Sequence, residues 1–159
     1  MLSNLTIRFA EKADIPRIEE LLYQVHGVHA DGRPDLFIPG MKKYDRSQLE
    51  HILADREDRP IFVAIIDGVL TGYCFCIHQE QKAASMVSVT TLYIDDLCVD
   101  ETCRGHGVGK ALYDYTVQYA RQNGYYNLTL NVWACNPSAM QFYKKCGLQV
   151  QKIGMETVL

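Results

Sequence analysis

The sequence predicts one domain of the α/β (α+β) class, with a mixed, mostly antiparallel sheet and helices on both faces. Its 159 residues suffice for one domain that buries a core without disulfides or metal. Apolar residues make up 48% and charged residues 22%, which is typical of a soluble globular protein. Strand-like and helix-like patterns follow one another as β, α, α, β, β, β, α, β, α, β, β, without repeats. We therefore treat residues 1–159 as one domain.

The first third predicts one strand and two helices. Leu5–Phe9 alternates polar and apolar residues, as a strand does. Asp14 caps a helix with Pro16 in its first turn. Five apolar residues at helical spacing give this helix a buried face: Ile15, Ile18, Leu21, Leu22 and Val25. The run 27–40 is rich in Gly, Pro and Asp and predicts a long loop, after which Asp45 or Ser47 begins a short helix.

The middle of the chain predicts three strands. Ile61–Ile66 is continuously apolar, Asp67-Gly68 is a strong hairpin turn, and Val69–His78 returns as the partner strand. A polar turn at Gln79–Ser85 leads into a long strand, Val87–Val99.

The last third predicts helices at Gly107–Asn123 and from Asn136-Pro137 to just before Gly147. Between them Leu128–Val132 is apolar and predicts a strand. From Leu148 the tail predicts two short strands with Gly154 between them.

Charge and hydropathy exclude several classes of protein. Sixteen Lys and Arg against nineteen Asp and Glu give a net charge of −3, whereas duplex-binding proteins usually carry a basic excess, so we expect no nucleic-acid partner. The longest apolar run, Ile61–Ile66, is far shorter than the ~20 residues of a membrane-spanning helix, so we expect no membrane partner. The first residues carry charges and lack a signal-peptide core, which predicts a cytoplasmic protein.

The cysteines have no C-x-x-C spacing, so the sequence predicts reduced thiols and no metal site. They are Cys74, Cys76, Cys98, Cys103, Cys135 and Cys146.

A glycine-rich loop is the most informative motif. Residues 104–110 read Arg-Gly-His-Gly-Val-Gly-Lys, between an apolar strand and an amphipathic helix. Alternating glycines let backbone approach a ligand closely, and free N–H groups at a helix start favour an anion. A Walker A loop would need Gly at Arg104 and Ser or Thr at Ala111, and the spacing is not the G-x-G-x-x-G of dinucleotide-binding loops. The remaining pattern is R-x-x-G-x-G at Arg104, Gly107 and Gly109.

With this loop, the preceding residues 95–99 and the downstream run 136–148, the chain resembles the GNAT superfamily of acyl-CoA-dependent N-acetyltransferases. The resemblance covers most of the chain, and residues 90–148 carry its specific part. Asp95–Val99 and Asn136 to Tyr143 are most similar to the spermidine/spermine (diamine) acetyltransferase branch. The resemblance implies a GNAT-like fold and acetyl-CoA as cofactor, with the pyrophosphate held by Arg104–Lys110 and the pantetheine arm by the backbone of Leu97 and Val99.

The resemblance also implies site residues. The N–H of Val99 would face the thioester oxygen. Asp95 matches the branch's general base, being Asp where the branch has Glu. Asp96 faces the opposite side if the strand is regular, whereas a bulge, which the family often has here, would remove that alternation. Tyr143 matches the general acid beside the cofactor sulfur. The residues implied to contact the cofactor are Leu97, Cys98, Val99, Arg104, Gly105, His106, Gly107, Val108, Gly109, Lys110, Asn136 and Tyr143.

The acceptor is expected under the first two helices and their loop. Asp31, Asp35, Asp45, Asp95 and Asp96 form a possible acidic mouth for a cationic amine. The leading hypothesis is an enzyme that acetylates a primary amine of a small molecule by direct attack in a ternary complex. The alternatives are acetylation of a protein N-terminus or lysine, and a non-enzymatic acyl-CoA-binding module. The diamine branch also makes a homodimer possible.

Overall fold

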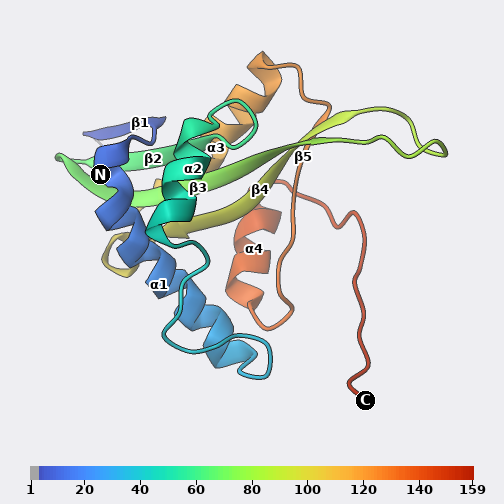
Figure 1. The fold of residues 1–159 in the computed structure, drawn as a ribbon, viewed down its shortest axis with the longest axis horizontal. Helices are drawn as coiled ribbons and strands as arrows, with labels where there is room; N and C mark the ends of the chain where they lie inside the picture. The colour runs from blue at the N-terminus through green and yellow to red at the C-terminus, as the bar shows by residue number, and fades with distance from the viewer. Residues whose placement is uncertain (1–3) are drawn as a thin grey trace.

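The computed structural model describes residues 4–159, and its centre is a five-stranded sheet of order β1-β2-β3-β4-β5 (Figure 1). Neighbouring strands are antiparallel except β4 and β5, which are parallel. The predicted mixed, mostly antiparallel sheet is thus confirmed. The strands are β1 (Leu5–Phe9), β2 (Ile61–Ile66), β3 (Val69–Glu80), β4 (Thr90–Val99) and β5 (Asn127–Leu130).

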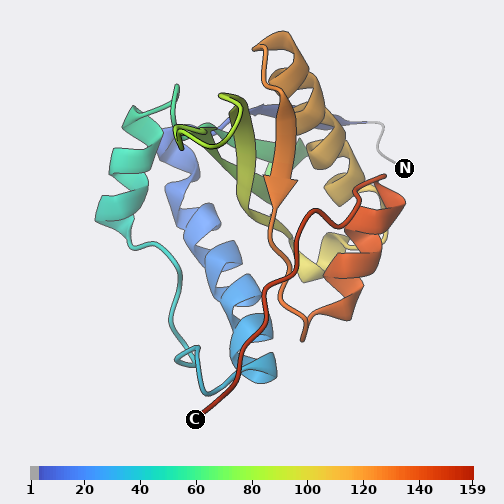
Figure 2. The ribbon, with the colours of Figure 1, turned by 90° about the vertical axis from the view of Figure 1, so that its right-hand side faces the viewer.

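Helices cover both faces of the sheet, as predicted (Figure 2). Helices α1 (Ile15–Gly32) and α2 (Arg46–Ala54) pack on one face, around a core that includes Leu21 and Tyr73. Helices α3 (Val108–Gln122) and α4 (Pro137–Lys145) cover the other, around Phe62 and Leu112. Two short 3-10 helices, η1 (Lys12–Asp14) and η2 (Glu101–Cys103), precede α1 and follow β4. Within residues 4–159, no helix is long and apolar enough to cross a membrane.

Several element boundaries follow local signals that the sequence displays. The Asp45 carboxylate accepts a hydrogen bond from the Gln48 N–H and caps α2. Asp67 and Gly68 take φ values of 48° and 79°, the left-handed turn that joins β2 to β3. Asn136 caps α4, with Pro137 at its first position.

Helix α1 is longer than predicted, because it passes through Gly27 and ends at Gly32. A glycine that ends a helix usually takes a positive φ, and Gly27 does not. Beyond Gly27, Ala30 is buried, so the last turns of α1 still contribute to packing. The predicted loop 27–40 is therefore replaced by a loop over residues 33–45.

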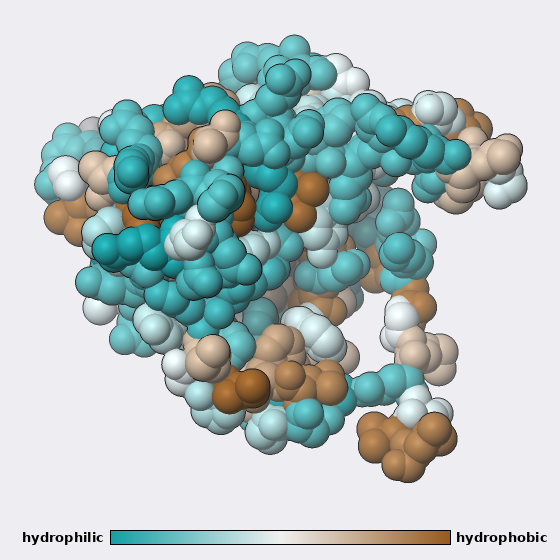
Figure 3. Space-filling view, viewed as in Figure 1, coloured by the Kyte–Doolittle hydropathy of each residue, from teal (hydrophilic) through white to brown (hydrophobic). Residues whose placement is uncertain are grey.

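The two strands predicted after Leu148 are not formed. Residues 149–159, all described by the structure, form neither helix nor strand, and Figure 3 shows a gap between part of this tail and the body. An extended segment needs the backbone groups of a neighbouring strand to become part of a sheet. The side chain of Glu156 is paired with Arg33, at the start of the loop after α1.

All six cysteines are free, as the sequence predicts. Cys74 and Cys76 lie in the same buried core with their sulfurs 3.8 Å apart.

Candidate active site at the open edge of β4

β4 changes its surroundings half-way along its length. From Thr91 to Ile94 it pairs with β5 on one side and β3 on the other. β5 ends at Leu130, opposite Ile94, whereas the pairing with β3 continues to Val99. Among the described strands, none therefore flanks residues 95–99 on the β5 side, and we call these residues the open edge.

The backbone of the open edge presents hydrogen-bonding groups away from β3. The Asp100 N–H donates to the Thr71 carbonyl, so the Val99 carbonyl of the same peptide points the opposite way. In a strand, the N–H and C=O of one residue point to the same side, and residues two apart repeat this orientation. The N–H groups of Leu97 and Val99 therefore face the open side, where an extended ligand has donors to bind.

A bulge at the start of the open edge places two carboxylates on one face. Asp96 lies opposite Phe75 and Ile94 opposite Cys76, so Asp95 is the extra residue in β4. Phe75 belongs to the core under α1 and α2, and both carboxylates contact side chains on that face. The expectation for a regular strand, with Asp96 facing the opposite side, does not hold because the bulge removes the alternation.

The Asp95 carboxylate is fully engaged by the loop that precedes α2. Lys43 Nζ lies 2.8 Å from Asp95 Oδ1 and 3.1 Å from the Asp95 carbonyl oxygen. The Tyr44 hydroxyl donates to the other carboxylate oxygen, and the Tyr44 ring stacks on Phe75 with centroids 5.6 Å apart. Burial, together with the Asp95 charge, raises the pKa of Tyr44, so this phenol stays protonated and remains a donor.

Asp96 has a different environment. It accepts a hydrogen bond from the hydroxyl of the buried Tyr73, 2.8 Å away. Burial raises the pKa of Asp96 to about 6, against the lowering effects of Tyr73 and of the Lys43 charge. A carboxyl group of this pKa changes its protonation state close to neutral pH, which suits proton transfer.

Tyr143 approaches the open edge from α4. Its ring packs edge-on against Phe142, with centroids 5.0 Å apart. Burial raises its pKa, and the charge of Asp96 adds to this effect. The neighbouring Phe142 packs in the same cluster as Leu97 and Val99, so α4 lies against the second half of β4.

The glycine loop lies at the far end of the open edge. Gly105 and Gly107 take φ values of 79° and 86°, which favour glycine. Gly107 precedes α3 and has no side chain that could cap it. The first N–H groups of α3, from Val108 to Lys110, therefore face outward without a side-chain acceptor. This is the geometry of an anion site at a helix N-terminus.

The charged side chains of the loop are used within the protein. Arg104 Nε donates to the Val99 carbonyl at 3.0 Å, which closes the loop onto the end of β4. Lys110 pairs with Asp114 one turn further along α3. The His106 ring lies 3.4 Å from the Cys103 carbonyl. The loop therefore offers its backbone more directly than its side chains.

Three predicted cofactor residues also have structural roles. A Cβ atom on Gly109 would lie 3.3 Å from the Phe142 ring, so this glycine permits close contact between α3 and α4. Cys98 points away from the open edge into the α1 core, and burial raises the pKa of its thiol to about 12. Asn136 caps α4 through its side-chain oxygen, which the Ala139 N–H reaches at 3.2 Å.

An anchor for the glycine loop was missed in the sequence. Asp100 is buried and accepts hydrogen bonds from Thr102, and Arg17 and Gln24 of α1 reach its other oxygen. The Thr102 hydrogen bonds lower the pKa of Asp100 to about 2, so it stays charged. Because Arg17 and Asp100 are 83 residues apart, no local pattern reveals this link.

The predicted acidic mouth is only partly assembled. Asp35 is paired with Arg33, and Asp45 caps α2, so neither is free for a ligand. Asp95 and Asp96 lie side by side at the bulge, and Asp31 is exposed in the last turn of α1.

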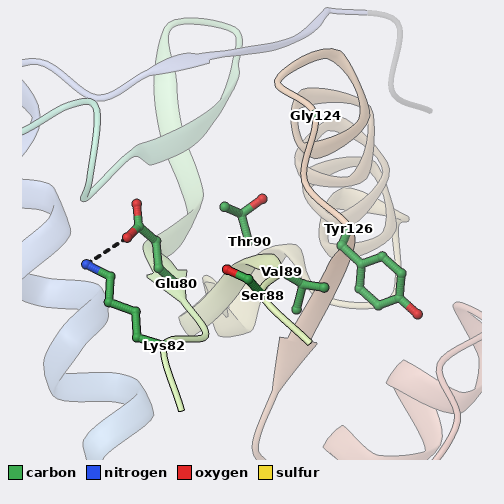
Figure 4. A pocket seen from close by; sticks show the side chains of 7 residues that line it. All are labelled: Glu80, Lys82, Ser88, Val89, Thr90, Gly124 and Tyr126. Atoms are coloured by element: carbon green, nitrogen blue, oxygen red, sulfur yellow. Dashed lines mark ion pairs between the residues drawn. The ribbon is translucent and has the colours of Figure 1, made fainter. Parts of the chain in front are cut away.

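A hollow of about 560 Å³ lies elsewhere, against the hairpin between β3 and β4 (Figure 4). Its lining is polar, includes the Glu80–Lys82 ion pair, and contains no residue of the open edge. We do not assign the site to this hollow.

Comparison with known proteins identifies the family. The model of the acetyltransferase (GNAT) family matches residues 24–148. The chain belongs to this family. Acetyl-CoA is the cofactor of GNAT acetyltransferases, in agreement with the resemblance seen in the sequence. The narrower resemblance to the diamine branch has no specific support among the relatives.

Individual relatives include enzymes with different acceptors. An L-amino acid N-acetyltransferase of Escherichia coli is 26% identical, over 99% of this chain and 91% of its own length. A peptidyl-lysine N-acetyltransferase of Salmonella typhimurium is 31% identical over 66% of this chain. The chain spans 61% of that relative and 64% of a further curated N-acetyltransferase that it matches.

Solved structures confirm the GNAT fold. The structure of a mutant Bacillus halodurans protein superposes with a TM-score of 0.91 at 28% identity, covering 97% of this chain and 99% of that one.

Proposed function

We propose that this GNAT protein transfers an acetyl group from acetyl-CoA to a primary amine of a small molecule, by direct attack in a ternary complex. The observation that carries the proposal is the open edge of β4. It has the outward-facing start of α3 at one end, two carboxylates at the other, and against it α4, which carries Tyr143 next to Phe142.

The residues present fit acetyl-CoA, which supplies an activated acetyl thioester. The outward N–H groups of Leu97 and Val99 would hold the pantetheine arm as an added strand is held. The backbone of residues 104–110 would hold the pyrophosphate. The Val99 N–H is the proposed donor to the thioester oxygen.

The carboxylate pair at the bulge is the proposed proton acceptor. A free alkyl amine has a pKa of about 10.4 and is almost entirely charged at pH 7, so it must lose a proton before it attacks. Asp95, which the resemblance favours as the base, is held by Lys43 and Tyr44. Asp96 beside it has the pKa suited to accepting a proton at neutral pH, directly or through water.

Tyr143 is the proposed donor to the sulfur that leaves. Its raised pKa keeps the phenol protonated at all physiological pH values. A phenol is also a weaker acid than a thiol even at its ordinary pKa. Tyr143 therefore acts as a hydrogen-bond donor to the developing thiolate, with proton transfer following late.

A small acceptor is favoured by the loop over residues 33–45, which is fixed at several points above the carboxylates. The Phe37 ring packs on His29 and Trp133, and the Ile38 carbonyl lies 2.7 Å from His26 Nε2. Lys43 and Tyr44 then tie the end of this loop to Asp95. A peptide would need an open groove here, whereas Lys43 and Tyr44 of this loop occupy the Asp95 carboxylate. The E. coli relative named for L-amino acids supports the same class of acceptor.

Acetylation of a protein lysine is the second candidate function. It is favoured by the S. typhimurium relative, which is named a peptidyl-lysine N-acetyltransferase. A protein substrate would require the loop 33–45 to move away from the carboxylates.

The deciding experiment measures release of coenzyme A thiol from acetyl-CoA with polyamines, amino acids, aminoglycosides and short peptides. We expect turnover of a small amine, reduced at least ten-fold by Tyr143→Phe, which corresponds to about 1.4 kcal/mol of barrier. Tyr126→Phe removes an exposed phenol outside the site and serves as the matched control.

Turnover of peptides alone would support the second candidate function. Binding of acetyl-CoA by calorimetry, without turnover of any amine, would contradict both and favour the non-enzymatic binding module.

The predicted homodimer and cytoplasmic location stay predictions. A dimer is supported by the tail, whose large apolar side chains are exposed: Val150, Ile153, Met155, Val158 and Leu159. Sedimentation equilibrium of the full chain measures the oligomeric state.

A further inference from the structure

The chain places one of its own primary amines in the proposed acceptor position. Lys43 comes from the loop before α2, 52 residues away from Asp95 in sequence. Its Nζ contacts both the Asp95 carboxylate and the Asp95 carbonyl, the first carbonyl of the open edge. A substrate amine that used the carboxylate pair would have to bind at the same point.

The surroundings of Lys43 contain what acetyl transfer needs. Asp96 is close enough for the Lys43 charge to lower its pKa, and that pKa lies near neutrality. The Leu97 N–H, two residues along the open edge from Asp95, faces the side where the pantetheine arm is proposed to lie. The side chain of Lys43 is 42% exposed, so it has room to move along the edge.

Four of the seven other lysines are held at other places. Lys12, Lys42, Lys82 and Lys110 are each paired with a carboxylate outside the open edge. Lys82 is the most useful comparison, because it is 77% exposed and paired with Glu80 at the distant hairpin. Exposure alone would therefore make Lys82 more reactive than Lys43 towards any free acylating agent.

We propose that Lys43 is a self-acetylation site, at which the enzyme acetylates its own side chain in cis. This inference rests on the proposed function. In the reaction, the neutral Lys43 Nζ forms a bond to the acetyl carbon while the bond from that carbon to sulfur breaks. The first proton lost by the ammonium goes to a carboxylate of the pair. The second proton, which Nζ loses as the amide forms, passes through Tyr143 or water to the coenzyme A thiolate, which leaves as the thiol. Acetylation removes the positive charge, so Lys43 releases Asp95 and the acceptor position is cleared for an external amine.

The test follows isotope-labelled acetyl groups from acetyl-CoA into the purified full chain by peptide mass spectrometry. We expect Lys43 to be labelled at least ten-fold faster than Lys82. The first-order rate at Lys43 should be unchanged on ten-fold dilution of the protein, because the reaction is intramolecular. Tyr143→Phe should slow labelling of Lys43 at least ten-fold and leave labelling of Lys82 unchanged.

A second readout needs no catalysis. Desulfo-coenzyme A, which has no thiol, should protect Lys43 but not Lys82 from modification by acetic anhydride. Protection of neither lysine, with binding confirmed by calorimetry, would place the arm away from Lys43 and overturn the proposal.

The outcomes separate this inference from the proposed function. Turnover of a small amine with Lys43 labelled no faster than Lys82 would overturn self-acetylation and leave the function intact. A rate at Lys43 that falls in proportion to dilution would also overturn it, because one chain would then be modifying another. If acetyl-CoA binds but neither Lys43 nor any amine is acetylated, both proposals fail.

Discussion

The two halves of β4 differ in what lies beside them. Thr90–Ile94 runs between β3 and β5, whereas Asp95–Val99 has β3 on one side and no strand of the described chain on the other. The apolar side chains that pack under α3 continue through both halves, from Leu92 to Val99. The first half therefore belongs to the core and the second half offers a binding edge, because β5 ends at Leu130. The open edge exists because β5 is shorter than β4.

Alanine substitution in each half tests this difference, with the largest effect expected in the first. Leu92 is fully buried, and Leu92→Ala should lower the free energy of unfolding by about 2–5 kcal/mol through the cavity it leaves. Leu97 is only partly buried, so Leu97→Ala should cost less, about 1–2 kcal/mol. Leu97→Ala should also weaken acetyl-CoA binding, and Leu92→Ala should not. Urea unfolding and calorimetry measure the two quantities. Equal stability losses with equal affinities would show that the open edge is ordinary core.

Substitution of Asp96, at the bulge where the open edge begins, tests the effect of its buried carboxyl group on stability. The pKa of Asp96 is about 6 in the folded protein, whereas an ordinary aspartate, as in the unfolded chain, has a pKa of 3.8. Ionisation of Asp96 therefore opposes folding. The cost is small below pH 4, grows as the pH rises from about 4 to 6, and levels off above pH 6 at up to about 3 kcal/mol. Asp96→Asn should therefore stabilise the protein at pH 7 but not at pH 4, because the amide oxygen still accepts from Tyr73. Thermal unfolding at the two pH values measures this difference.

Asp96→Asn and the matched variant Asp95→Asn also show which of the two carboxylates accepts the proton from the substrate amine. The charged and titratable groups around Asp96 are Asp95, Lys43, Tyr73, Cys98 and Tyr143. If Asp96 accepts the proton, kcat/KM of the unaltered enzyme decreases as the pH is lowered past 6, and we call this decrease the acid limb. Asp96→Asn should lower kcat/KM at least ten-fold and remove the acid limb. Asp95→Asn should keep the limb and shift it, since it removes a like charge and loosens Lys43. A limb lost in Asp95→Asn and kept in Asp96→Asn would assign the base to Asp95.

Local signals in the sequence were enough to predict most elements. Asp67-Gly68, the Asp45 cap and Asn136-Pro137 act within a few residues, and each forms the predicted turn or helix start. The errors arose where a local pattern depends on a distant partner. Gly27 suggested a helix end, whereas the burial of Ala30 stabilises a longer helix. The tail has strand-like alternation, and no described strand lies beside it.

The residues of the candidate site also differ in whether local sequence or distant contacts determine them. The glycine loop and Tyr143 stand in one continuous stretch that resembles the family pattern, so the sequence alone is enough to propose their roles, which stay predictions. A bulge at Asp95 and Asp96 was suggested only by the family resemblance, because the residues of β4 themselves do not show where its alternation breaks. The contacts of Lys43 and Tyr44 with Asp95 join residues more than 50 positions apart. The sequence therefore indicated which carboxylate matches the family, whereas the structure shows what each carboxylate touches.

The smallest expected effect concerns α4, which holds Tyr143 beside the open half of β4. Asn136→Ala removes the cap of α4 and should lower the free energy of unfolding by about 1 kcal/mol. Asn136→Ser restores a capping oxygen and should restore stability. If the Asn136 amide N–H also contacts the pantetheine arm, as the family resemblance implies, KM for acetyl-CoA should stay several-fold raised in both variants. A serine variant that recovers KM together with stability would limit Asn136 to capping, and the arm would then be held by the β4 backbone without it.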